Sequence, residues 1–306
     1  MAKTPKFTKH GLALEALAKY FMSVDVNTRI LTVSEFEASI EAARGTIQNS
    51  IKQLCDVKAI TLVSRGQLGT FLVNKDLKAL LKYAGISFLI GVMPLPYSKS
   101  YEGLSTGVLQ TMENNLNIPV NMAYMRGAHR RVEMILNQRY DFAIVSKFAA
   151  CNYLQKNDDI EVIIEFDEGS FLSNHVLMFN QPHYTEILDG MRVGIDRDSI
   201  DQSSLTIQAT QGKDVKFVEV SYNQLINKLM HDEIDAAIWN GDEAKLHLDH
   251  FYIHSLNLDH KNNTIATIII DKSRQELKSL IGSLVNVHEV MDLQRKVMNG
   301  ELTPSY

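Results

Sequence analysis

The amino-acid sequence predicts an α/β chain with a small helical domain at the N-terminus and a two-lobed body after it. One observation is a repeat: VEMILNQRYDFAIVS (132–146) and INKLMHDEIDAAIWN (226–240) both place apolar residues at helical spacing before an aspartate and a short apolar run. The other is the pattern of residues 11–73, three helical stretches followed by two short strands. A helix that leads twice into a buried strand indicates two similar lobes, and two lobes form a cleft.

Length and composition are those of a folded chain of ordinary type. The 306 residues predict two or three domains, and 45% apolar residues supply their cores. No apolar run approaches the roughly 20 residues that cross a bilayer, and the N-terminal stretch lacks the pattern of a secretory signal. Cys55 and Cys151 lie far apart in the sequence. We therefore expect a cytoplasmic protein with two reduced thiols in its core.

The net charge of −5 hides an asymmetry between the two parts of the chain. Residues 1–80 contain eleven Lys and Arg against seven Asp and Glu, a local balance of +4, which leaves −9 for the remainder. A small basic domain before a larger acidic body favours contact of the first with a polyanion. Random surface variation would explain an imbalance of this size equally well.

The first two predicted helices have clear sequence signals. Between Gly11 and Met22, apolar residues at positions 12, 14, 17, 18 and 21 lie on one face of a helix. A second helix, SEFEASI, follows Thr32 or Ser34, either of which can cap its N-terminus. Two short amphipathic helices at this spacing predict the start of a helix-turn-helix.

The third predicted helix, ARGTIQNSIKQL, has the side chains of a nucleic-acid interface. Ile47, Ile51 and Leu54 form its apolar stripe. Arg, Gln and Asn suit base edges in a major groove, and Thr and Lys suit phosphates. The residues that the stripe leaves exposed, and that we predict to bind DNA, are Arg44, Thr46, Gln48, Asn49 and Lys52.

After the third helix, AITLVSRGQLGTFLV predicts a β-hairpin whose turn carries Arg65 and Gln67. A hairpin after three helices is a winged helix, and Arg65 at its tip would reach a phosphate or a minor groove. The pattern resembles the GntR-type winged helix-turn-helix, although Lys58 stands where those regulators often have glycine. The residues that carry the resemblance are Glu35, Arg44, Thr46, Leu54, Gly66, Gly69, Thr70 and Phe71. The alternative is a three-helix module that only packs against the body.

The predicted domains are a DNA-binding domain at 1–74, a helical connector at 75–86 that ends at Gly85, and a bilobal effector-binding domain at 87–306. The body opens with the strand SFLIGVM, an irregular loop and the helical stretch GVLQTMENNL. Ligands of open α/β sheets bind beyond the carboxyl ends of the strands, and a helix N-terminus after such a loop favours an anion. An ordinary surface loop is the alternative. The candidate ligand-binding residues of this loop are Pro94, Tyr97, Ser98 and Tyr101.

Further candidates lie at the other predicted strand ends. Arg126 beside Gly127 suits a carboxylate or phosphate, or an ion pair with one of the body's acids. The ends of the two repeats, Ser146-Lys147 and Trp239-Asn240, are expected to face each other across the cleft, although a buried tryptophan is more often part of a core. The strand TIATIIID and the helix after it are expected to return to the first lobe. The second lobe adds Asp196, Ser199, Ser221 and Tyr222, and for Ser199 helix capping is the alternative role.

The body also resembles one family of bacterial transcriptional regulators, the YhfZ family. The resemblance implies a winged-helix domain joined to a domain similar to periplasmic binding proteins of the type-2 class, and it implies no particular effector. It rests on Met93-Pro94-Leu95-Pro96-Tyr97, Tyr101-Glu102-Gly103, Met125-Arg126-Gly127-Ala128, Ile238-Trp239-Asn240, Glu301 and Pro304-Ser305-Tyr306.

Common catalytic signatures are missing from the sequence: it has no G-x-S-x-G, phosphate loop, C-x-x-C or H-E-x-x-H. His247, His250 and His254 would share a face of a helix and bind zinc or nickel. The segment alternates like a strand, however, which favours surface histidines. We therefore predict no cofactor and no metal site.

Together these features predict a cytoplasmic transcriptional regulator that is not an enzyme. It would read a palindromic operator in double-stranded DNA as a homodimer or higher homo-oligomer, and a small polar or anionic effector would bind between its lobes. An enzyme of the same bilobal fold, of transferase or pyrimidine-forming type, is the main alternative because fold does not fix function. A protein-interaction module with a vestigial cleft is the third possibility.

Overall fold

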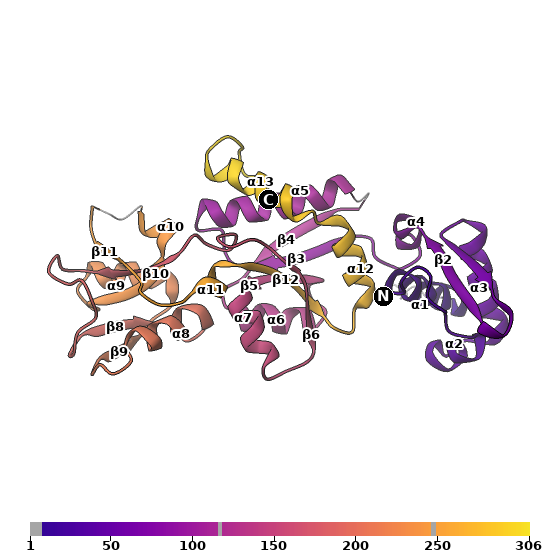
Figure 1. Cartoon of the computed structure of the whole chain (residues 1–306), viewed down its shortest axis with the longest axis horizontal. Helices are drawn as coiled ribbons and strands as arrows, with labels where there is room; N and C mark the ends of the chain where they lie inside the picture. Colours follow the sequence, from indigo (N-terminus) through magenta and orange to yellow (C-terminus); the bar gives the residue numbers. More distant parts are fainter. Residues whose placement is uncertain (1–7, 116–117, 246–248) are drawn as a thin grey trace, which may run out of the picture. The chain divides into compact units, whose positions relative to one another are not determined.

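The computed structural model of the chain describes residues 8–115, 118–245 and 249–306 (Figure 1). These residues form two compact units. Unit 1 consists of Met1–Leu89, Glu113–Pro119 and Arg274–Leu284. Unit 2 consists of Ile90–Met112, Val120–Ser273 and Val285–Tyr306.

Unit 1 begins with the three predicted helices. Leu17 and Phe21 on the apolar face of α1 are fully buried, as are Ile47 and Leu54 of α3. Thr32, one of the two predicted caps, forms a complete capping box with Glu35, so that two backbone N–H groups at the start of α2 are paired. The three helices are α1 (Lys9–Ser23), α2 (Val33–Ile40) and α3 (Arg44–Asp56).

The predicted hairpin follows α3. β1 (Ile60–Ser64) pairs antiparallel with β2 (Thr70–Lys75), and the connecting turn contains the short helix η1 (Gly66–Leu68). Arg29 adds an isolated bridge to Phe71, so the stretch before α2 lies along the hairpin. Lys58 has a φ of 59°, a left-handed conformation in which glycine is the usual residue. This conformation explains why related sequences would favour glycine at that position.

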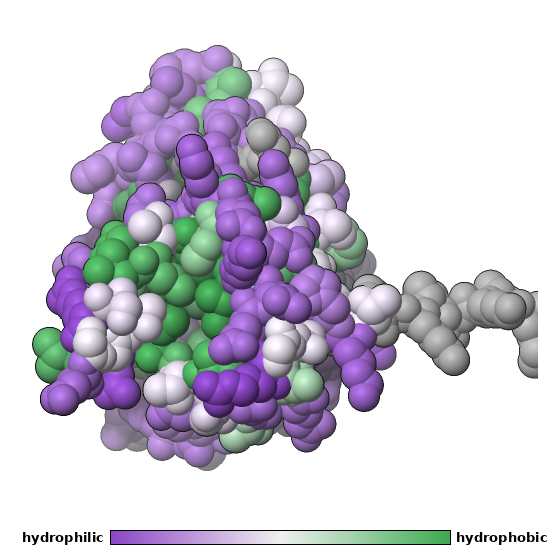
Figure 2. Space-filling model, turned by 90° about the vertical axis from the view of Figure 1, so that its right-hand side faces the viewer, coloured by the Kyte–Doolittle hydropathy of each residue, from purple (hydrophilic) through white to green (hydrophobic). Residues whose placement is uncertain are grey.

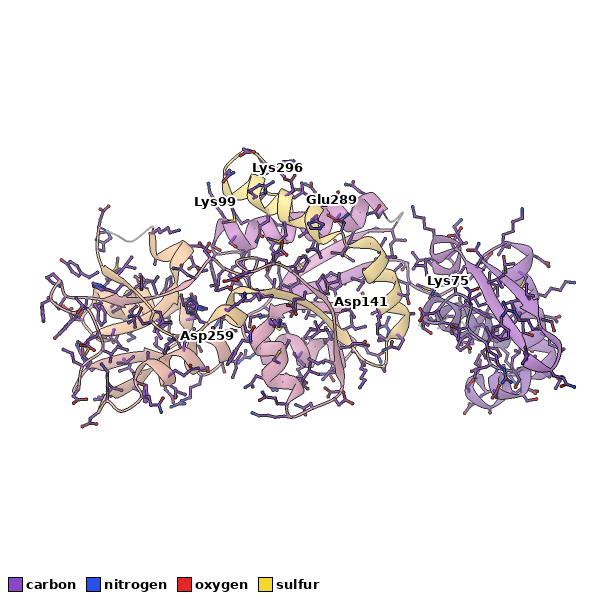
Figure 3. The ribbon with its side chains drawn as sticks, in the orientation of Figure 1. Lys75, Lys99, Asp141, Asp259, Glu289 and Lys296 are labelled. Carbon is purple, nitrogen blue, oxygen red and sulfur yellow. The ribbon has the colours of Figure 1, made fainter. Side chains whose placement is uncertain are left out.

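Two further helices complete unit 1, α4 (Leu77–Leu81) and α12 (Gln275–Leu284), and both pack against α1. The sequence predicted that α12 would return to the first lobe with the strand before it. Instead, α12 groups with the N-terminal helices in unit 1, because its apolar face packs against α1. Lys75, labelled in Figure 3, donates to the carbonyl oxygens of Met22 and Val24 at 2.6 and 2.7 Å and so caps the end of α1.

Unit 2 contains two five-stranded mixed sheets, and we call the lobe around each sheet lobe A or lobe B. The strand order is β4-β3-β5-β12-β6 in lobe A and β11-β7-β10-β8-β9 in lobe B. Lobe A has β3 (Leu89–Met93), β4 (Val120–Tyr124), β5 (Phe142–Ser146), β6 (Ile160–Glu165) and β12 (Ala266–Asp271). Lobe B has β7 (His175–Phe179), β8 (Arg192–Ile195), β9 (Lys216–Glu219), β10 (Ala236–Asn240) and β11 (Tyr252–Ser255).

Strands and helices alternate in the same order in the two lobes. In lobe A they are α5 (Lys99–Asn115), α6 (Ala128–Leu136), α7 (Lys147–Leu154) and α13 (Val287–Met298). In lobe B they are α8 (Ile200–Ala209), α9 (Leu225–Met230) and α10 (Gly241–Ala244), with the turn η2 (Tyr222–Gln224) before α9. The segment between the lobes contains α11 (Lys261–Thr264).

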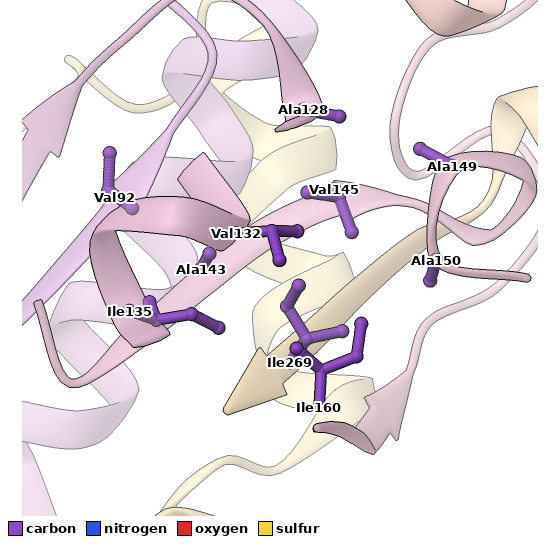
Figure 4. Packing of buried hydrophobic residues seen from close by; sticks show 10 residues of the cluster. All are labelled: Val92, Ala128, Val132, Ile135, Ala143, Val145, Ala149, Ala150, Ile160 and Ile269. Carbon is purple, nitrogen blue, oxygen red and sulfur yellow. The ribbon is translucent and has the colours of Figure 1, made fainter. Parts of the chain in front are cut away.

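The predicted sequence repeat is confirmed as a structural repeat. Its first copy is α6 followed by β5, and its second copy is α9 followed by β10. β5 is parallel to β3 and antiparallel to β12, while β10 is parallel to β8 and antiparallel to β7. In lobe A the repeat buries Val132, Ile135 and Val145 in one apolar cluster (Figure 4). Leu229 and Trp239 lie in the corresponding cluster of lobe B.

The repeated aspartates have the same role in both lobes. Asp141 (Figure 3) accepts a hydrogen bond from the backbone N–H of Ile90 at 2.9 Å, and its own N–H donates to the Ile90 carbonyl. Asp235 does the same with Arg192, at 2.7 Å. Each carboxylate therefore pairs a backbone N–H at the start of the neighbouring parallel strand and helps to set the register of the central pair. This role explains why the repeat has aspartate at that position.

Two other expectations are corrected in lobe A. The predicted loop after β3 is shorter than expected, because α5 begins at Lys99 and Tyr101 is a buried helical residue. Gly103 and Gly107 lie one turn apart on α5 and let the backbone of α13 approach closely. Cys151 is exposed on α7 and is not a core thiol, whereas Cys55 is half-buried.

Two crossings of the chain join the lobes, one between β6 and β7 and the other between β11 and β12. They lie side by side: the N–H of Phe171 donates to the carbonyl of Thr264 at 2.8 Å, and the N–H of Ala266 donates to Ser170 Oγ at 2.8 Å. Paired crossings of this kind act as one hinge between two lobes.

Candidate functional sites

The first candidate site is the polar face of α3 in unit 1. Arg44, Gln48, Asn49 and Lys52 are exposed, and Thr46 is half-buried. Burial of Ile47 and Leu54 holds the other face of the helix against the core. The structure thus presents the predicted base- and phosphate-binding side chains to solvent on one helix, as a major-groove interface requires.

The hairpin adds a second group of polar side chains to this site. Arg65 and Gln67 are exposed in the turn, and the Arg65 guanidinium lies 4.4 Å from the centre of the Phe71 ring. This cation–π contact holds the charge of Arg65 at the hairpin. Arg29, which sequence reasoning missed, is exposed and lies against Gly69 of the same turn. Arg29 could have been found only from the strand pairing before α2, and no local sequence motif predicts that pairing.

The second candidate site is a pocket between lobes A and B with a cavity of about 90 Å³. It lies at the carboxyl ends of the central strands, where the N-terminal ends of α5, α6 and α8 converge. The residues lining it are Pro94, Leu95, Tyr97, Tyr101, Arg126, Gly127, Ala128, Arg131, Phe171, Leu172, His175, Asp196, Ser199, Ile200, Asp201, Gln202 and Tyr222.

The structure brings together most, but not all, of the predicted ligand-binding residues. Those that line the pocket are Pro94, Tyr97, Tyr101, Arg126, Gly127, Asp196, Ser199 and Tyr222. Those outside its lining are Ser98, Ser146, Lys147, Ser221, Trp239 and Asn240. Ser199 accepts a hydrogen bond from the Gln202 N–H and so has the alternative role of a helix cap, and Ser98 accepts from the Tyr101 N–H in the same way.

Arg126 forms an ion pair across the pocket. Its Nη2 lies 2.8 Å from Asp196 Oδ2, which joins the loop before α6 in lobe A to the end of β8 in lobe B. Asp196 is almost fully buried and also accepts from the backbone N–H groups of Tyr222 and Asp198, at 2.7 and 3.1 Å. The sequence left two roles open for Arg126, ligand binding or an ion pair. The structure shows the ion pair.

Replacing Arg126 by methionine should destabilise unit 2 by about 1–3 kcal/mol, because it leaves the buried Asp196 carboxylate without its cation. Arg130 supplies a matched control. It pairs with Asp198 of the same loop, but both side chains are more than half exposed, and such pairs contribute about 0–1 kcal/mol. Urea unfolding followed by the fluorescence of Trp239 measures both variants. Equal losses for Arg126→Met and Arg130→Met would contradict a special role for the Arg126 pair.

A second polar link between the lobes centres on Asp201 of α8. Its carboxylate accepts from Ser146 Oγ at 2.8 Å and from Asn263 Nδ2 at 2.7 Å. Burial raises the pKa of Asp201, and these two hydrogen bonds partly oppose the shift. Ser146 thus connects the end of the first repeat to lobe B without lining the pocket.

The two repeat ends share a structural role beside the pocket. Ser146 caps α7 and Asn240 caps α10, each through its own side-chain oxygen. Lys147 turns to Glu165 within lobe A, with 2.6 Å between Nζ and Oε1. Trp239 is buried and stacks on Tyr222 with ring centres 4.0 Å apart. The alternative of a core tryptophan therefore matches the structure.

Sequence reasoning missed two buried polar residues of the pocket, Arg131 and His175. Both are 4% exposed. Burial lowers the pKa of Arg131 to about 10, and burial together with nearby His260 lowers that of His175 to about 3, so at neutral pH the arginine is charged and the imidazole is neutral. Arg131 lies in a helical stretch beside Arg130, and His175 starts a strand after the crossing. Neither position has a local motif, so only the fold reveals them.

Burial also raises the pKa values of the Tyr97, Tyr101 and Tyr222 hydroxyls, which stay protonated. Behind them, burial raises the pKa of Glu243 to about 7, while a hydrogen bond from Asn240 opposes the shift. The pocket therefore offers neutral hydroxyl donors in addition to its charged groups.

The histidine segment gives no metal site in the part of the chain that the structure describes. His254 lies on strand β11, as the alternation predicted, and no group of three or more His, Cys, Asp or Glu residues there could hold a metal ion. His247 lies outside the described residues. Among the described helices, none combines the length and apolar character that crossing a bilayer requires.

Comparison with known proteins identifies both parts of the chain, the N-terminal part and the body. Residues 27–72 match a helix-turn-helix domain family, and residues 76–306 match the YhfZ C-terminal domain family. The chain is 31% identical to the YhfZ protein of Escherichia coli strain K12 over 301 residues, which are 97% of this chain and 98% of the relative.

Two solved structures are similar as well. The crystal structure of YhfZ from Shigella flexneri has 32% identity and a TM-score of 0.63, covering 75% of this chain and 97% of that chain. An ancestral arginine-binding protein has 10% identity and a TM-score of 0.51, covering 71% and 99%, and shows a shared fold alone. The predicted architecture, a helix-turn-helix domain before a domain with the fold of periplasmic binding proteins, is confirmed. The chain belongs to the YhfZ family.

Proposed function

We propose that this protein is a cytoplasmic transcriptional regulator that binds operator DNA as a homodimer and responds to a small polar or anionic effector in the pocket between lobes A and B. The helix-turn-helix domain and the family indicate a DNA-binding regulator, and the fold of the body indicates a small-molecule ligand. The observation that carries the proposal is that one chain combines an exposed polar helix face with a pocket lined by buried polar groups.

The DNA half of the proposal rests on the chemistry of α3 and the hairpin. Arg44, Gln48 and Asn49 have side chains that form paired hydrogen bonds with base edges, while Lys52 suits a phosphate. Arg29 and Arg65 place two guanidinium groups at the hairpin. A helix in the major groove with a charged hairpin beside it is the binding mode that this arrangement supports.

The effector half rests on the contacts between the lobes. The Arg126–Asp196 pair and the Asp201–Ser146 bond both connect lobe A to lobe B, and the paired crossings of the chain let the lobes move as two bodies. A ligand that contacts both lobes changes the balance between open and closed arrangements by its difference in affinity for the two. In the proposed mechanism, this change alters the affinity for the operator.

Two observations support the homodimer in this proposal: the exposed apolar side chains of unit 1 and the expected symmetry of the operator. Figure 2 shows an apolar area among polar side chains on the side of the molecule that it faces. Monomeric proteins rarely expose large contiguous apolar patches, so a second copy is the proposed partner. Analytical ultracentrifugation of the full chain tests this part. The large apolar side chains of unit 1 that are exposed include Leu12, Val26, Leu31, Val57, Val63 and Leu68.

DNA binding is tested by titrating the full chain with duplexes from the promoter region of its own gene and with random duplexes at physiological salt, read by fluorescence anisotropy. A regulator binds one of the promoter duplexes about 10³-fold or more tighter than random DNA. Equal affinity for promoter and random duplexes would contradict the proposal.

Replacing Arg44 by alanine should weaken binding to the specific duplex by about 1–3 kcal/mol if its guanidinium reads a base. Lys82→Ala is the control, because Lys82 is an exposed cation after α4, away from α3 and the hairpin in sequence. The measurement is the affinity for specific and random duplexes side by side. An equal loss on both duplexes would instead make Arg44 a phosphate contact.

A further inference from the structure

The pocket contains one buried cation without a carboxylate partner, Arg131. Its Nε donates to the Ile144 carbonyl at 3.1 Å, and its Nη1 donates to the Met125 carbonyl at 2.8 Å. Within the described residues no acidic side chain forms an ion pair with it, and its Nη2 has no hydrogen-bond partner. The charge of the Asp201 carboxylate acts to raise the pKa of Arg131, but the two side chains form no ion pair. Because a buried charge is costly without a close counter-charge, a guanidinium fixed in this way at a pocket wall fits an incoming anion.

Arg126, the cation that the sequence suggested, already has a partner. Its guanidinium pairs with the Asp196 carboxylate, which is itself held by two backbone N–H groups. An anionic ligand at Arg126 would have to displace this carboxylate or share its charge. The structure therefore favours Arg131 over Arg126 as the residue that binds an anion.

The N-terminus of α6 lies in the same wall and adds to the positive potential. Gly127 occupies the N-cap position with a φ of 79°, and no side chain in the described part of the chain caps this end of the helix. By contrast, Ser98 accepts from the Tyr101 N–H in α5, and Ser199 caps α8. Since the N-terminus of a helix carries a partial positive charge, the uncapped end of α6 attracts an anion beside Arg131.

His175 provides an independent sign of a ligand. Its side chain lines the pocket and is 4% exposed, and its Nδ1 atom has no hydrogen-bond partner among the described residues. An unpaired buried ring nitrogen is unfavourable, and a polar ligand would satisfy it. The imidazole is neutral, so it adds a hydrogen bond without a second positive charge. One buried cation and one neutral histidine suit a monoanion better than a phosphate dianion.

The wall formed by α8 carries the opposite charge. Asp201 accepts from Ser146 and Asn263, but Ser146 has a single hydroxyl hydrogen to share between both carboxylate oxygens. Asp201 Oδ2 therefore has room for one more donor. A cavity of about 90 Å³ holds on the order of four non-hydrogen atoms, by comparison with the engineered cavity of about 150 Å³ that binds the six carbon atoms of benzene.

We propose that the pocket binds the head group of a small carboxylic acid that carries a hydrogen-bond donor on the neighbouring carbon, with the carboxylate on Arg131 and the N-terminus of α6 and the donor on Asp201. Both α-amino acids and α-hydroxy acids have this head group. The proposal rests on the effector role proposed above and names the ligand class for that role.

Five probes of similar size test the class by their effect on the melting temperature of the full chain. L-Alanine and D-alanine have a carboxylate and an ammonium group, L-lactate replaces the ammonium with a hydroxyl, propionate lacks the donor, and L-alaninamide lacks the carboxylate. At 20 mM, at least one of the first three should raise the melting temperature by roughly 2–4 °C. Propionate and alaninamide should each raise it by less than about 1 °C. The alanine and lactate arms distinguish amino from hydroxy acids.

Arg131→Met should abolish the response to the carboxylates, whereas Arg130→Met, one residue earlier on α6 and exposed, should keep it. Because the ranking of the five probes on the unaltered chain needs no variant, the test remains decisive even if Arg131→Met does not fold. Three results would overturn the proposal: alaninamide as effective as alanine, an unchanged response in a folded Arg131→Met chain, or no response to any of the five probes.

Failure of the ligand class and failure of the proposed function give different results. Promoter binding is measured with and without the carboxylate that raises the melting temperature most. A carboxylate that binds through Arg131 but leaves DNA affinity unchanged would contradict effector control and support the ligand class. A change in DNA affinity caused by a cationic or uncharged metabolite, with no response to carboxylates, would contradict the ligand class and support effector control.

Discussion

Replacing Gly103 and Gly107 together by alanine is expected to destabilise unit 2 by about 2–6 kcal/mol, with about 1–3 kcal/mol for each site. A Cβ on Gly107 would lie 2.7 Å from the Val290 carbonyl oxygen, and one on Gly103 would lie 2.8 Å from the carbonyl oxygen of Gln294. Both contacts are with the backbone of α13, which cannot move without losing the burial of Val290 and Gln294. Chemical denaturation followed by far-UV circular dichroism measures the loss.

The sign of this prediction is informative, because alanine normally stabilises a helix relative to glycine by roughly 0.5–1 kcal/mol. Gly282 in α12 is the matched control: it has an ordinary helical φ, and a Cβ there would meet nothing within 4 Å. Gly282→Ala should therefore leave stability unchanged or raise it. A stabilising effect of Gly107→Ala would show that α13 does not pack as closely on α5 as the structure indicates.

Replacing Asp235 by alanine is expected to destabilise unit 2 by about 2–4 kcal/mol at neutral pH. The change removes the acceptor for the first N–H of β8 and breaks the paired contact with the Arg192 guanidinium, which has 2.6 Å between Nη2 and Oδ1. Asp235→Asn keeps an acceptor for the N–H and should cost less. Urea unfolding followed by the fluorescence of Trp239, which lies on the adjoining strand, measures both variants.

The stability lost in the Asp235→Ala variant should depend on pH, and the direction of this dependence follows from the pKa of Asp235. Burial alone would raise the pKa of Asp235, but hydrogen bonds and charge from Arg192 outweigh it and lower the pKa below the ordinary value. A carboxyl with a lowered pKa stabilises the folded state above its unfolded pKa of about 3.9, and the contribution disappears as pH falls through the folded pKa. The difference between the unaltered chain and Asp235→Ala should therefore shrink below about pH 4. Glu219→Ala, which removes an exposed pair with Arg197, should change stability by less than about 1 kcal/mol at any pH.

The elements that could be predicted from the sequence are those whose signals are local. The helix cap at Thr32, the apolar stripe of Ile47 and Leu54, and the hairpin turn at Gly69 depend on residues within one or two turns of each other, and the structure confirms them. The repeated aspartates were found for the same reason. Their partners, Ile90 and Arg192, lie 51 and 43 residues away in the sequence and could not be read from it.

The start of α5, the position of α12 and the exposure of Cys151 were predicted wrongly, because each depends on packing between segments far apart in the chain. Tyr101 looked like a loop residue after two prolines, but burial against Phe171 makes it part of a helix, with ring centres 5.2 Å apart. For the same reason the pocket could be predicted only in part. Residues at strand ends were found, whereas Arg131 in the middle of a helical pattern and His175 after a crossing were not.

The sequence by itself determined that a helix-turn-helix with a hairpin precedes two similar α/β lobes, because helix periodicity, caps, turns and an internal repeat are properties of short stretches of chain. The tertiary structure alone decided which charges are paired. It joined Arg126 to Asp196 and left Arg131 at the pocket wall without a carboxylate partner among the described residues. The physical reason is that pairing and burial depend on which distant segments the fold brings within a few ångströms, and a guanidinium has the same sequence signature whether it is paired or free.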